Sequence, residues 1–373
     1  MRLGLRPDSV PERAALALGL VPTPFLHTHP TLLLARALMA AVEHGLFESL
    51  ADGPQPAPEV ARACGTHPAA TEALLDALVG AGYLERRGEG YALRPVARRW
   101  LLPESPCSLV DSIRFRALEW DWIARLDDFL VTGEPLDFHQ AMSEEEWGLY
   151  QRGMLALARL AVPETVRRAP VPDGARTLLD LGGSHGAFAS AFCDRYTNLR
   201  ATVLDLPEAL VHAAPLLNDA APDAGVRARI THRAGDALAD DLGVEAWDVV
   251  FVGQLVHHFG EDAGRSLVRR IARALRPGGV LIVQEVMRDP AADDQLGTLA
   301  GLYFALTSAA GTRTFEEIAG WQREAGLAPQ RSVRFRTLPG VGQQNAVKQR
   351  TKDRGQRTAD GGQKGRRGAR EPR

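Results

Sequence analysis

The sequence predicts an α/β protein with a doubly wound, Rossmann-like sheet that follows a mostly helical N-terminal domain of winged-helix type. Three observations lead to this class. Residues 177–197 read as a buried strand, a glycine turn and a helix, the first unit of a nucleotide-binding sheet. Strand and helix patterns alternate regularly from Gly174 onward. The first hundred residues carry helix patterns that end in a short hairpin.

The N-terminal segment begins with a short helix near 11–19 and a connector punctuated by Pro22 and Pro24. The patterns that follow predict a buried helix over 31–50, a helix from Pro58 to Gly65, a third helix capped by Thr66, and a hairpin turned by Gly88 and Gly90. Three helices followed by a two-stranded wing are typical of a winged-helix domain.

A winged helix that binds DNA places basic or amide side chains of its third helix in the major groove. Residues 68–84 contain Glu72 and Asp76 but no Lys or Arg, and Arg86 and Arg87 in the wing do not reverse this balance. The sequence therefore favours a dimerisation or substrate-lid role. A winged-helix regulator that senses a small ligand stays open as an alternative from a different class.

Residues 109–168 predict helices that connect the two parts and line a substrate pocket. An aromatic stripe at helical spacing (Phe115, Trp120, Trp122, Phe129) is typical of a core, although some of these rings could face a flat ligand. Strands are expected at 177–181, 200–204, 228–232, 247–252, 279–284 and 331–337, with LRPGG as a helix end and turn before the fifth. The polar segment GQQNAVKQ is expected to close the sheet as an antiparallel strand.

The composition divides the chain into an acidic body and a basic end. The 373 residues carry a net charge of −2, but residues 351–373 hold eight Lys or Arg against three acids and lack large apolar side chains. We expect four parts: a dimerisation domain (1–108), connecting helices (109–168), a cofactor-binding domain (169–350) and a disordered basic tail (351–373). The favoured interpretation of the tail is a solvated segment without a ligand, and nucleic-acid binding is the less favoured alternative.

Cysteine content and hydropathy indicate the compartment. Three scattered cysteines (Cys64, Cys107, Cys193) have no metal-ligand spacing and favour a reducing environment. No apolar run reaches the ~18 residues that a membrane span needs, and Pro11 and Glu12 interrupt the one weak signal-like stretch. We expect a cytoplasmic protein with no membrane partner.

The glycine turn lacks the fingerprints of two common phosphate sites. Gly182, Gly183 and Gly186 do not fit G-x-G-x-x-G, and no Lys follows Gly186 as a P-loop requires. Asp180 precedes the turn, while Asp205 and Asp236 follow the next two strands. Three acids in register suit a cationic adenosyl ligand, with its ribose on Asp205, although each Asp alone could simply end a strand.

These segments resemble a known family. DLGGSHG, VLDLPEAL, AGDAL, VHHFGEDAGRSLVRRIARALRPGG and VLIVQEV are similar, in this order, to the class I S-adenosylmethionine-dependent methyltransferases. More narrowly, residues 10–350 resemble O-methyltransferases of the plant caffeate type and their bacterial natural-product relatives, which have an N-terminal winged-helix dimerisation domain. The resemblance implies S-adenosyl-L-methionine (SAM) as cofactor, S-adenosyl-L-homocysteine (SAH) as product, and a homodimer.

The resemblance also assigns site residues, and it implies no metal. The cofactor set is Asp180, Gly182, Gly183, Gly186, Asp205 with Leu206, Asp236 with Ala237, Gln254, and Met154 on the helix before the sheet. His257 aligns with the family's general base and His258 with an aspartate, and a slip of one residue would exchange them. Glu285 matches the carboxylate partner of the base. A second family glutamate falls near Thr312, where this chain has no acid.

The expected reaction is transfer of the SAM methyl group to a hydroxyl of a small aromatic or polyketide-like metabolite. Methyl transfer from a sulfonium is an in-line displacement that depends mainly on positioning, and a histidine can take the hydroxyl proton. The structural alternative is that the His257–His258 pair caps the helix starting at Glu261. Carbon or nitrogen methylation, or an activity other than methyl transfer, stays open within the same fold.

Overall fold

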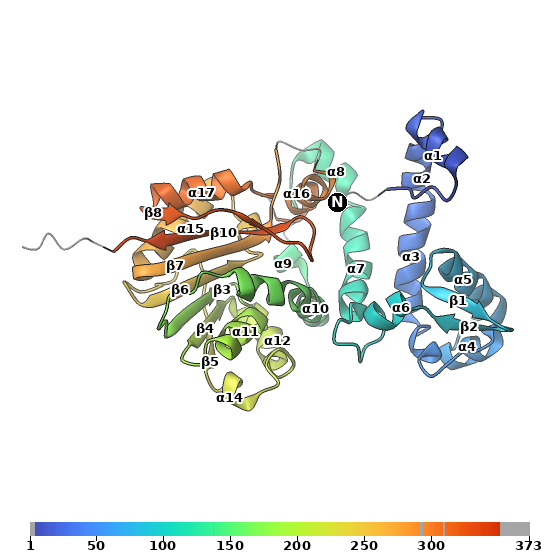
Figure 1. Ribbon diagram of the computed structural model, residues 1–373, viewed down its shortest axis with the longest axis horizontal. Helices are drawn as coiled ribbons and strands as arrows, with labels where there is room; N and C mark the ends of the chain where they lie inside the picture. Colours follow the sequence, from blue (N-terminus) through green and yellow to red (C-terminus); the bar gives the residue numbers. More distant parts are fainter. Residues whose placement is uncertain (1–3, 137, 291–293, 309, 351–373) are drawn as a thin grey trace, which may run out of the picture.

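The computed structural model describes residues 4–136, 138–290, 294–308 and 310–350. The predicted tail, 351–373, lies outside these residues. Figure 1 shows a sheet domain, a smaller N-terminal domain, and a set of helices between them.

The N-terminal domain contains the three predicted helices and the wing. Its elements are α1 (Val10–Ala17), α2 (Thr23–Thr28), α3 (Pro30–Glu43), the 3₁₀ helix η1 (Glu48–Leu50), α4 (Ala57–Cys64), α5 (Pro68–Gly80), β1 (Leu84–Arg87), β2 (Gly90–Leu93) and α6 (Pro95–Trp100). A buried apolar core that includes Phe47, Leu75 and Tyr91 joins them. Burial of these side chains is what allows short helices of low intrinsic stability to persist.

Three local predictions in this domain are wrong. The connector with Pro22 and Pro24 forms helix α2, because proline is tolerated in the first helical turn. The helix predicted over 31–50 ends at Glu43, and Gly45 (φ +70°) turns the chain. The N-cap of α5 is His67 rather than Thr66, whose hydroxyl instead lies 2.6 Å from that of Thr71.

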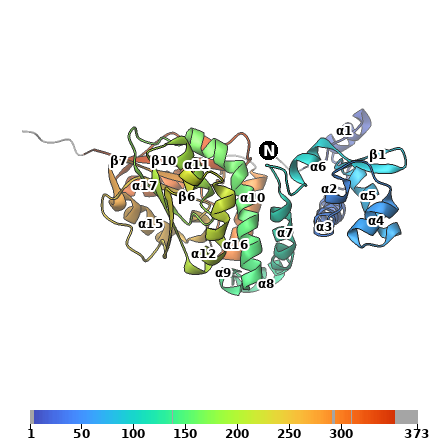
Figure 2. The ribbon, with the colours of Figure 1, turned by 90° about the horizontal axis from the view of Figure 1, so that it is seen from below.

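Four helices follow and lead into the sheet. They are α7 (Val110–Ile123), α8 (Leu126–Thr132), α9 (Phe138–Ala141) and α10 (Glu144–Arg168). Helix α10 begins at a capping box in which Ser143 and Glu146 satisfy each other's backbone N–H groups. Figure 2 shows α10 running beside the sheet, with α7 between it and the N-terminal domain.

The sheet has the predicted doubly wound topology. Its strands are β3 (Thr177–Leu181), β4 (Arg200–Asp205), β5 (Ile230–Ala234), β6 (Trp247–Gly253), β7 (Leu275–Val286), β8 (Leu327–Pro329), β9 (Val333–Arg334) and β10 (Val341–Lys348). The spatial order is β5-β4-β3-β6-β7-β10-β8, with β9 also paired to β10. Strands β3 to β7 are parallel and β10 is antiparallel to its neighbours. The order of the strands reverses between β3 and β6, since β4 and β5 lie on one side of this point and β6 and β7 on the other, and ligands of such sheets bind at this switch point.

Helices cover both faces of the sheet. The remaining helical elements are α11 (Ala187–Arg195), α12 (Pro207–Ala213), η2 (Ala214–Leu216), α13 (Leu217–Ala220), α14 (Ala224–Arg227), η3 (Val256–His258), α15 (Glu261–Ala274), α16 (Gln295–Ser308) and α17 (Phe315–Glu324). One core joins α10 and α11 to one face, and a second joins α15 and α17 to the other. Both faces are buried, so the parallel strands are apolar on both sides.

The strand predictions differ from the structure at the C-terminal edge. LRPGG is not a turn before a strand, because β7 already begins at Leu275 and an irregularity of register separates the pair Trp247–Leu275 from the pair Val249–Val280. The strand predicted at 331–337 is only Val333–Arg334. The polar strand β10 is an inner strand, and its Gln343 Nε2 donates to the carbonyl of Thr165 over 3.0 Å.

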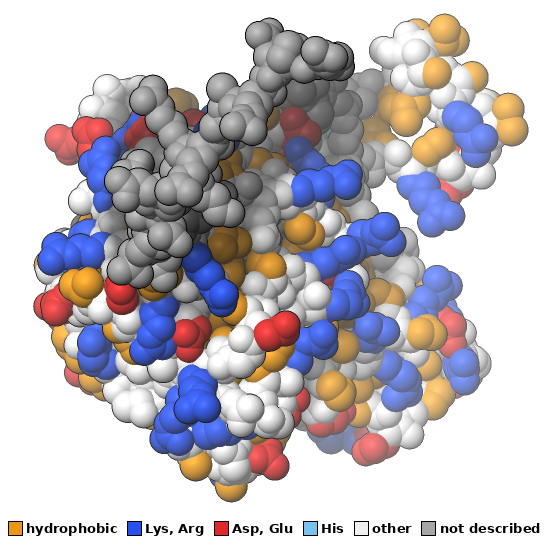
Figure 3. All heavy atoms as spheres, turned by 60° about the vertical axis from the view of Figure 1, so that its left-hand side comes forward, with side chains coloured by type: hydrophobic (Ala, Val, Ile, Leu, Met, Phe, Trp, Pro, Cys, Tyr) orange, Lys and Arg blue, Asp and Glu red, His pale blue; other side chains and the backbone are white. Residues whose placement is uncertain are grey.

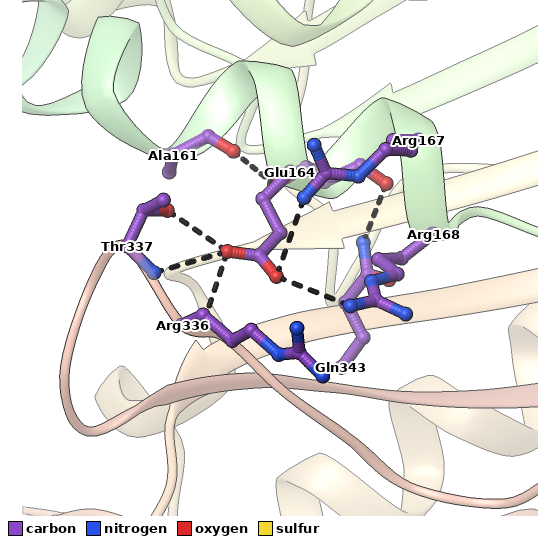
Figure 4. A network of polar contacts seen from close by, with 8 residues as sticks. Ala161, Glu164, Arg167, Arg168, Arg336, Thr337 and Gln343 are labelled. Atoms are coloured by element: carbon purple, nitrogen blue, oxygen red, sulfur yellow. Dashed lines mark hydrogen bonds and ion pairs between the residues drawn. The ribbon is translucent and has the colours of Figure 1, made fainter.

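A buried carboxylate ties α10 to the loop before β10. Glu164, 1% exposed, accepts hydrogen bonds from the N–H groups of Arg336 (3.0 Å) and Thr337 (3.2 Å) and from the Thr337 hydroxyl (2.8 Å) (Figure 4). Arg167 and Arg168 lie 3.6 and 3.7 Å from its other oxygen. Burial opposes ionisation, but the hydrogen bonds from Thr337 and Arg336 outweigh it and lower the pKa of Glu164.

Glu164→Gln is expected to lower the free energy of unfolding by roughly 2–4 kcal/mol, because one amide cannot accept all these hydrogen bonds. Since the folded pKa of Glu164 is depressed, its stabilisation is fully present above the unfolded pKa of about 4.3 and is lost as the pH falls through the folded value. Urea unfolding at pH 7 and near pH 3 measures both effects. The exposed Glu145→Gln on the same helix is the matched control, and equal losses in the two variants would contradict the prediction.

Candidate active site

A cavity of about 470 Å³ opens at the carboxyl ends of β3, β4, β5 and β6. Helices α7, α9, α10 and α16 and the segment η3 complete its wall. Ten of the twelve predicted site residues line it: Met154, Asp180, Gly182, Gly183, Asp205, Leu206, Asp236, Ala237, Gln254 and His257. The exceptions are Gly186 and Glu285. The motifs read separately along the sequence thus meet around one space.

The glycine turn needs glycine at two positions. Gly182 has φ +65°, and a Cβ there would lie 2.9 Å from Cδ1 of Leu255. A Cβ on Gly183 would lie 2.5 Å from Cγ of Asp180, so only glycine lets the turn pass over this carboxylate. Gly186 (φ +73°) does not line the cavity, and it immediately precedes α11 and packs near Leu217. Gly186 therefore allows the backbone to turn into α11 and does not form part of the cavity wall.

Asp180 is a buried carboxylate that pairs with no side chain among the described residues. It is 1% exposed, and neither carboxylate oxygen has a hydrogen-bond partner in the described part of the chain. Burial raises the pKa of Asp180 to about 7; the backbone N–H of Ala189 opposes this increase and the charge of Asp205 adds to it. A buried, unpaired carboxylate is costly, and a cationic ligand would offset that cost.

Asp205 and Asp236 form the rim next to Asp180. Asp205 accepts from the N–H groups of Ser184 and Leu206, each over 2.8 Å, and burial raises its pKa despite these bonds. Ser184 has φ +50°, a conformation that is uncommon outside glycine, and this strain aims its N–H at Asp205. Asp236 is exposed and accepts from the N–H of Leu238, while Ala237 beside it is buried. Three acids, with no Lys or Arg among the described residues of these strand ends that line the cavity, suit a cationic adenosyl ligand.

His257 and Glu285 form a buried pair. His257 Nδ1 lies 2.8 Å from Glu285 Oε2, and the N–H of Val256 donates to Glu285 Oε1 over 2.6 Å. The His257 ring stacks on Phe304 with 3.7 Å between ring centroids. Glu285 is 1% exposed and lies behind the histidine. Both carboxylate oxygens are therefore occupied by η3, which holds the imidazole in one orientation.

Two further histidines line the cavity beside this pair. His258 lies 4.2 Å from His257 between ring centroids, and its Nδ1 is 2.8 Å from the hydroxyl of Ser308. His139, on α9, lies 4.9 Å from His258. Burial lowers the pKa of His258 well below its usual range and that of His139 to about 4, with the neighbouring histidines adding to both shifts. Neither His257 nor His258 caps α15, whose N-cap is Gly260.

The cavity continues into an aromatic region between α7, α9, α10 and α16. Its wall includes Phe115, Phe138, Trp147, Tyr150 and Phe304. Of the four aromatic residues in the predicted stripe, only Phe115 lines it, and Trp122 packs behind Phe115 and Phe138. Aromatic side chains thus dominate this part of the wall, as is typical of small-molecule sites.

Several residues of the wall were not predicted from the sequence. His139, Arg116, Glu119 and Tyr303 come from helices whose positions depend on tertiary packing. Thr312, where a second acid was sought, is buried away from the cavity and donates to the carbonyl of Gly297 over 3.2 Å. The segment 109–168 was expected to line the pocket, but nothing in its sequence marks His139, Arg116 or Glu119 as the side chains that do so.

Two kinds of feature are absent from the described residues. They contain no group of three or more His, Cys, Asp or Glu side chains arranged to hold a metal ion. No helix among them is long and apolar enough to cross a membrane.

Comparisons with known proteins give the same picture. The O-methyltransferase domain family matches residues 129–328, and the O-methyltransferase dimerisation domain family matches residues 27–103. A 3-hydroxy-5-methyl-1-naphthoate 3-O-methyltransferase from Streptomyces sahachiroi is 30% identical over 325 residues, covering 82% of this chain and 89% of the relative. A tetracenomycin polyketide synthesis 8-O-methyl transferase from Streptomyces glaucescens is 32% identical over 316 residues, covering 80% and 89%.

One relative acts on nitrogen, and solved structures share the fold. An N,N-dimethyltransferase from Streptomyces rimosus is 30% identical over 319 residues, covering 82% of this chain and 90% of the relative. The structure of human N-acetylserotonin methyltransferase in complex with SAM superposes with a TM-score of 0.75 at 21% identity, covering 93% of this chain and 100% of that chain.

The fold is that of an α/β transferase with a cavity at the switch point of its sheet. Within that class, the chain belongs to the O-methyltransferase family and depends on SAM. The predicted fold class, family and cofactor are confirmed.

Proposed function

We propose that this enzyme methylates a hydroxyl group of a small aromatic or polyketide-like metabolite, with His257 as general base. The observation that carries the proposal is the 2.8 Å contact between His257 Nδ1 and Glu285 Oε2 at a cavity that also contains the acidic rim. Relatives that act on a naphthoate and in tetracenomycin polyketide synthesis support this substrate class.

The residues present fit a SAM molecule. Asp180 has two unpartnered carboxylate oxygens near the glycine turn, Asp205 and Asp236 follow on the next two strands, and Met154 and Gln254 face the same cavity. We propose that Asp205 holds the ribose diol, that Asp236 with Ala237 holds the adenine, and that Asp180 lies near the positive charges. When bound, SAM supplies an electrophilic methyl group on a sulfonium.

The protein's part in the reaction is positioning and proton transfer. Glu285 is a hydrogen-bond acceptor when ionised, so His257 carries its proton on Nδ1 and leaves Nε2 as the accepting nitrogen. Nε2 then takes the hydroxyl proton as the oxygen attacks, and Glu285 stabilises the imidazolium that forms. The aromatic wall excludes water and holds the substrate ring.

Nitrogen methylation is a second candidate because one relative of similar identity is an N,N-dimethyltransferase. A neutral amine has a free lone pair and does not need a base to attack. Dependence of the rate on His257 therefore separates the two candidates.

We also propose that the chain forms a homodimer through residues 1–108, with 109–168 lining the substrate pocket and 169–350 binding the cofactor. The N-terminal helices expose large apolar side chains, visible on the lobe at the upper right of Figure 3. They include Leu18, Leu20, Phe25, Leu32 and Leu33. A face of this kind is unusual on a monomer, and a second copy would cover it.

One set of measurements on the purified chain tests these assignments. Light scattering is expected to give twice the mass of one chain, and calorimetric titration is expected to show SAH binding. Asp205→Ala should weaken SAH binding by about 10–100-fold, because it removes two charged hydrogen-bond acceptors. The exposed Asp127→Ala is the control. Wild-type protein that fails to bind SAH would refute the cofactor site, and unchanged binding by Asp205→Ala would refute the ribose assignment.

A further inference from the structure

An ion pair lies in the aromatic wall of the cavity. Arg116 and Glu119, both on α7, are joined through Nη1 and Oε2, and the hydroxyl of Tyr303 on α16 donates to Glu119 Oε1. Glu119 is 3% exposed, and each of its oxygens is occupied by one of these two partners. The carboxylate is therefore fixed between two helices that both line the cavity.

Arg116 has N–H groups that donate to no residue in the described part of the chain. A guanidinium has five N–H donors in one plane, and only Nη1 has a hydrogen-bond partner in the described part of the chain. The Arg116 side chain is 34% exposed, it touches the cavity, and its guanidinium lies 5.0 Å from the ring centre of Phe115. Among the described residues that line the cavity, Arg116 is the sole Lys or Arg.

A contribution to folding stability does not explain the Arg116–Glu119 pair well. Removing two charges from water costs about as much as their attraction returns, and apolar residues of similar volume often serve a core equally well. The neighbouring wall residues Phe115, Phe138 and Tyr150 are aromatic. A planar donor fork in such a wall matches a carboxylate or carbonyl oxygen on a flat ligand.

Two aromatic side chains of the wall lie between the Arg116–Glu119 pair and His257. His257 stacks on Phe304 at 3.7 Å, and Phe304 lies 5.4 Å from Tyr303 between ring centroids. Phe304 and Tyr303 thus separate His257 from the Arg116–Glu119 pair along this wall. A molecule that contacts both must extend along these two side chains, which suits an aromatic of two or more fused rings.

We propose that Arg116, held by Glu119 and Tyr303, binds an oxygen acceptor of the substrate, a carboxylate or a conjugated carbonyl, at the end remote from the methylated hydroxyl. This inference rests on the proposed function, and it narrows the substrate class to aromatics of two or more fused rings that carry such an acceptor. Glu119 acts through Arg116 and is a positioning residue.

Calorimetric titration of the SAH-loaded protein with three probes tests the proposal. The probes are 6-hydroxy-2-naphthoate, its neutral methyl ester, and 2-naphthol, which lacks the acceptor. Both acceptor-bearing probes are expected to bind at least about tenfold more tightly than 2-naphthol, as one hydrogen bond to a charged donor would give. Tighter binding of the carboxylate than of the ester identifies an anionic acceptor, and equal binding identifies a carbonyl.

A double variant separates recognition from structure. Arg116→Met with Glu119→Gln removes both charges without leaving a buried carboxylate unpaired, and it should reduce the preference to within about twofold while 2-naphthol binds as before. Arg125→Met with Asp128→Asn, an exposed pair at the start of α8, is the matched control. A purely structural pair would lower the melting temperature and leave the preference intact.

Three results would overturn the inference: equal binding of the three probes, binding of none, or a preference that survives in the double variant. Protein that does not take up SAH would instead count against the proposed function. The two failures are therefore distinguishable in one series of titrations.

Discussion

Replacing His257 by alanine is expected to lower kcat by about 10²–10⁴-fold, the usual contribution of a positioned general base. The affinity for SAH should stay within about twofold, because the acids of the rim are untouched. SAH formation measured at saturating SAM gives kcat, and calorimetry gives the affinity. The structure favours this histidine because its Nδ1 faces Glu285 at 2.8 Å, which leaves Nε2 to accept a proton.

The neighbouring histidine provides the internal control. His258 also lines the cavity, but its Nδ1 contacts the hydroxyl of Ser308 rather than a carboxylate. A larger loss of kcat in His258→Ala than in His257→Ala would indicate that His258 is the general base. Full activity of His257→Ala would show that the reaction does not need His257 as a base, and it would favour methyl transfer to an amine.

The parallel part of the fold was predictable because its signals are local. Strand β3 has the predicted bounds, since a run of apolar residues ends at a glycine turn. The C-terminal edge was not predictable, because β9 is only two residues of a segment, 331–337, that contains three arginines, and its pairing depends on β10. Helix α2 was missed because Pro24 was read as a break, although proline fits the first turn of a helix.

The site residues also fall into two groups, those with a local signal in the sequence and those placed by helix packing. The acids, the glycines and His257 follow the ends of strands, so a parallel sheet brings them together once the strands are recognised. His139, Arg116 and Tyr303 instead belong to separate helices, where a polar residue that faces solvent and one that faces a cavity look the same in sequence. Their proximity is a product of how α7, α9 and α16 pack.

Glu285→Gln is expected to reduce kcat by roughly 10²–10⁴-fold with little change in SAH affinity. The amide has one accepting oxygen, whereas the carboxylate receives both the N–H of Val256 and His257 Nδ1. One of these groups must then face an NH₂ group, which favours the wrong tautomer or turns the ring. The change also removes the negative charge that stabilises the imidazolium.

Comparison with the double variant decides how Glu285 acts. If its effect passes through His257, Glu285→Gln should cost almost nothing more in a His257→Ala background, because residues that act as a unit are strongly non-additive. Independent effects would multiply, so that the double variant falls far below either single one. Glu261→Gln, an exposed change at the start of α15, controls for the loss of a carboxylate near η3. Multiplicative losses would show that Glu285 supports the fold or the cofactor rather than the base.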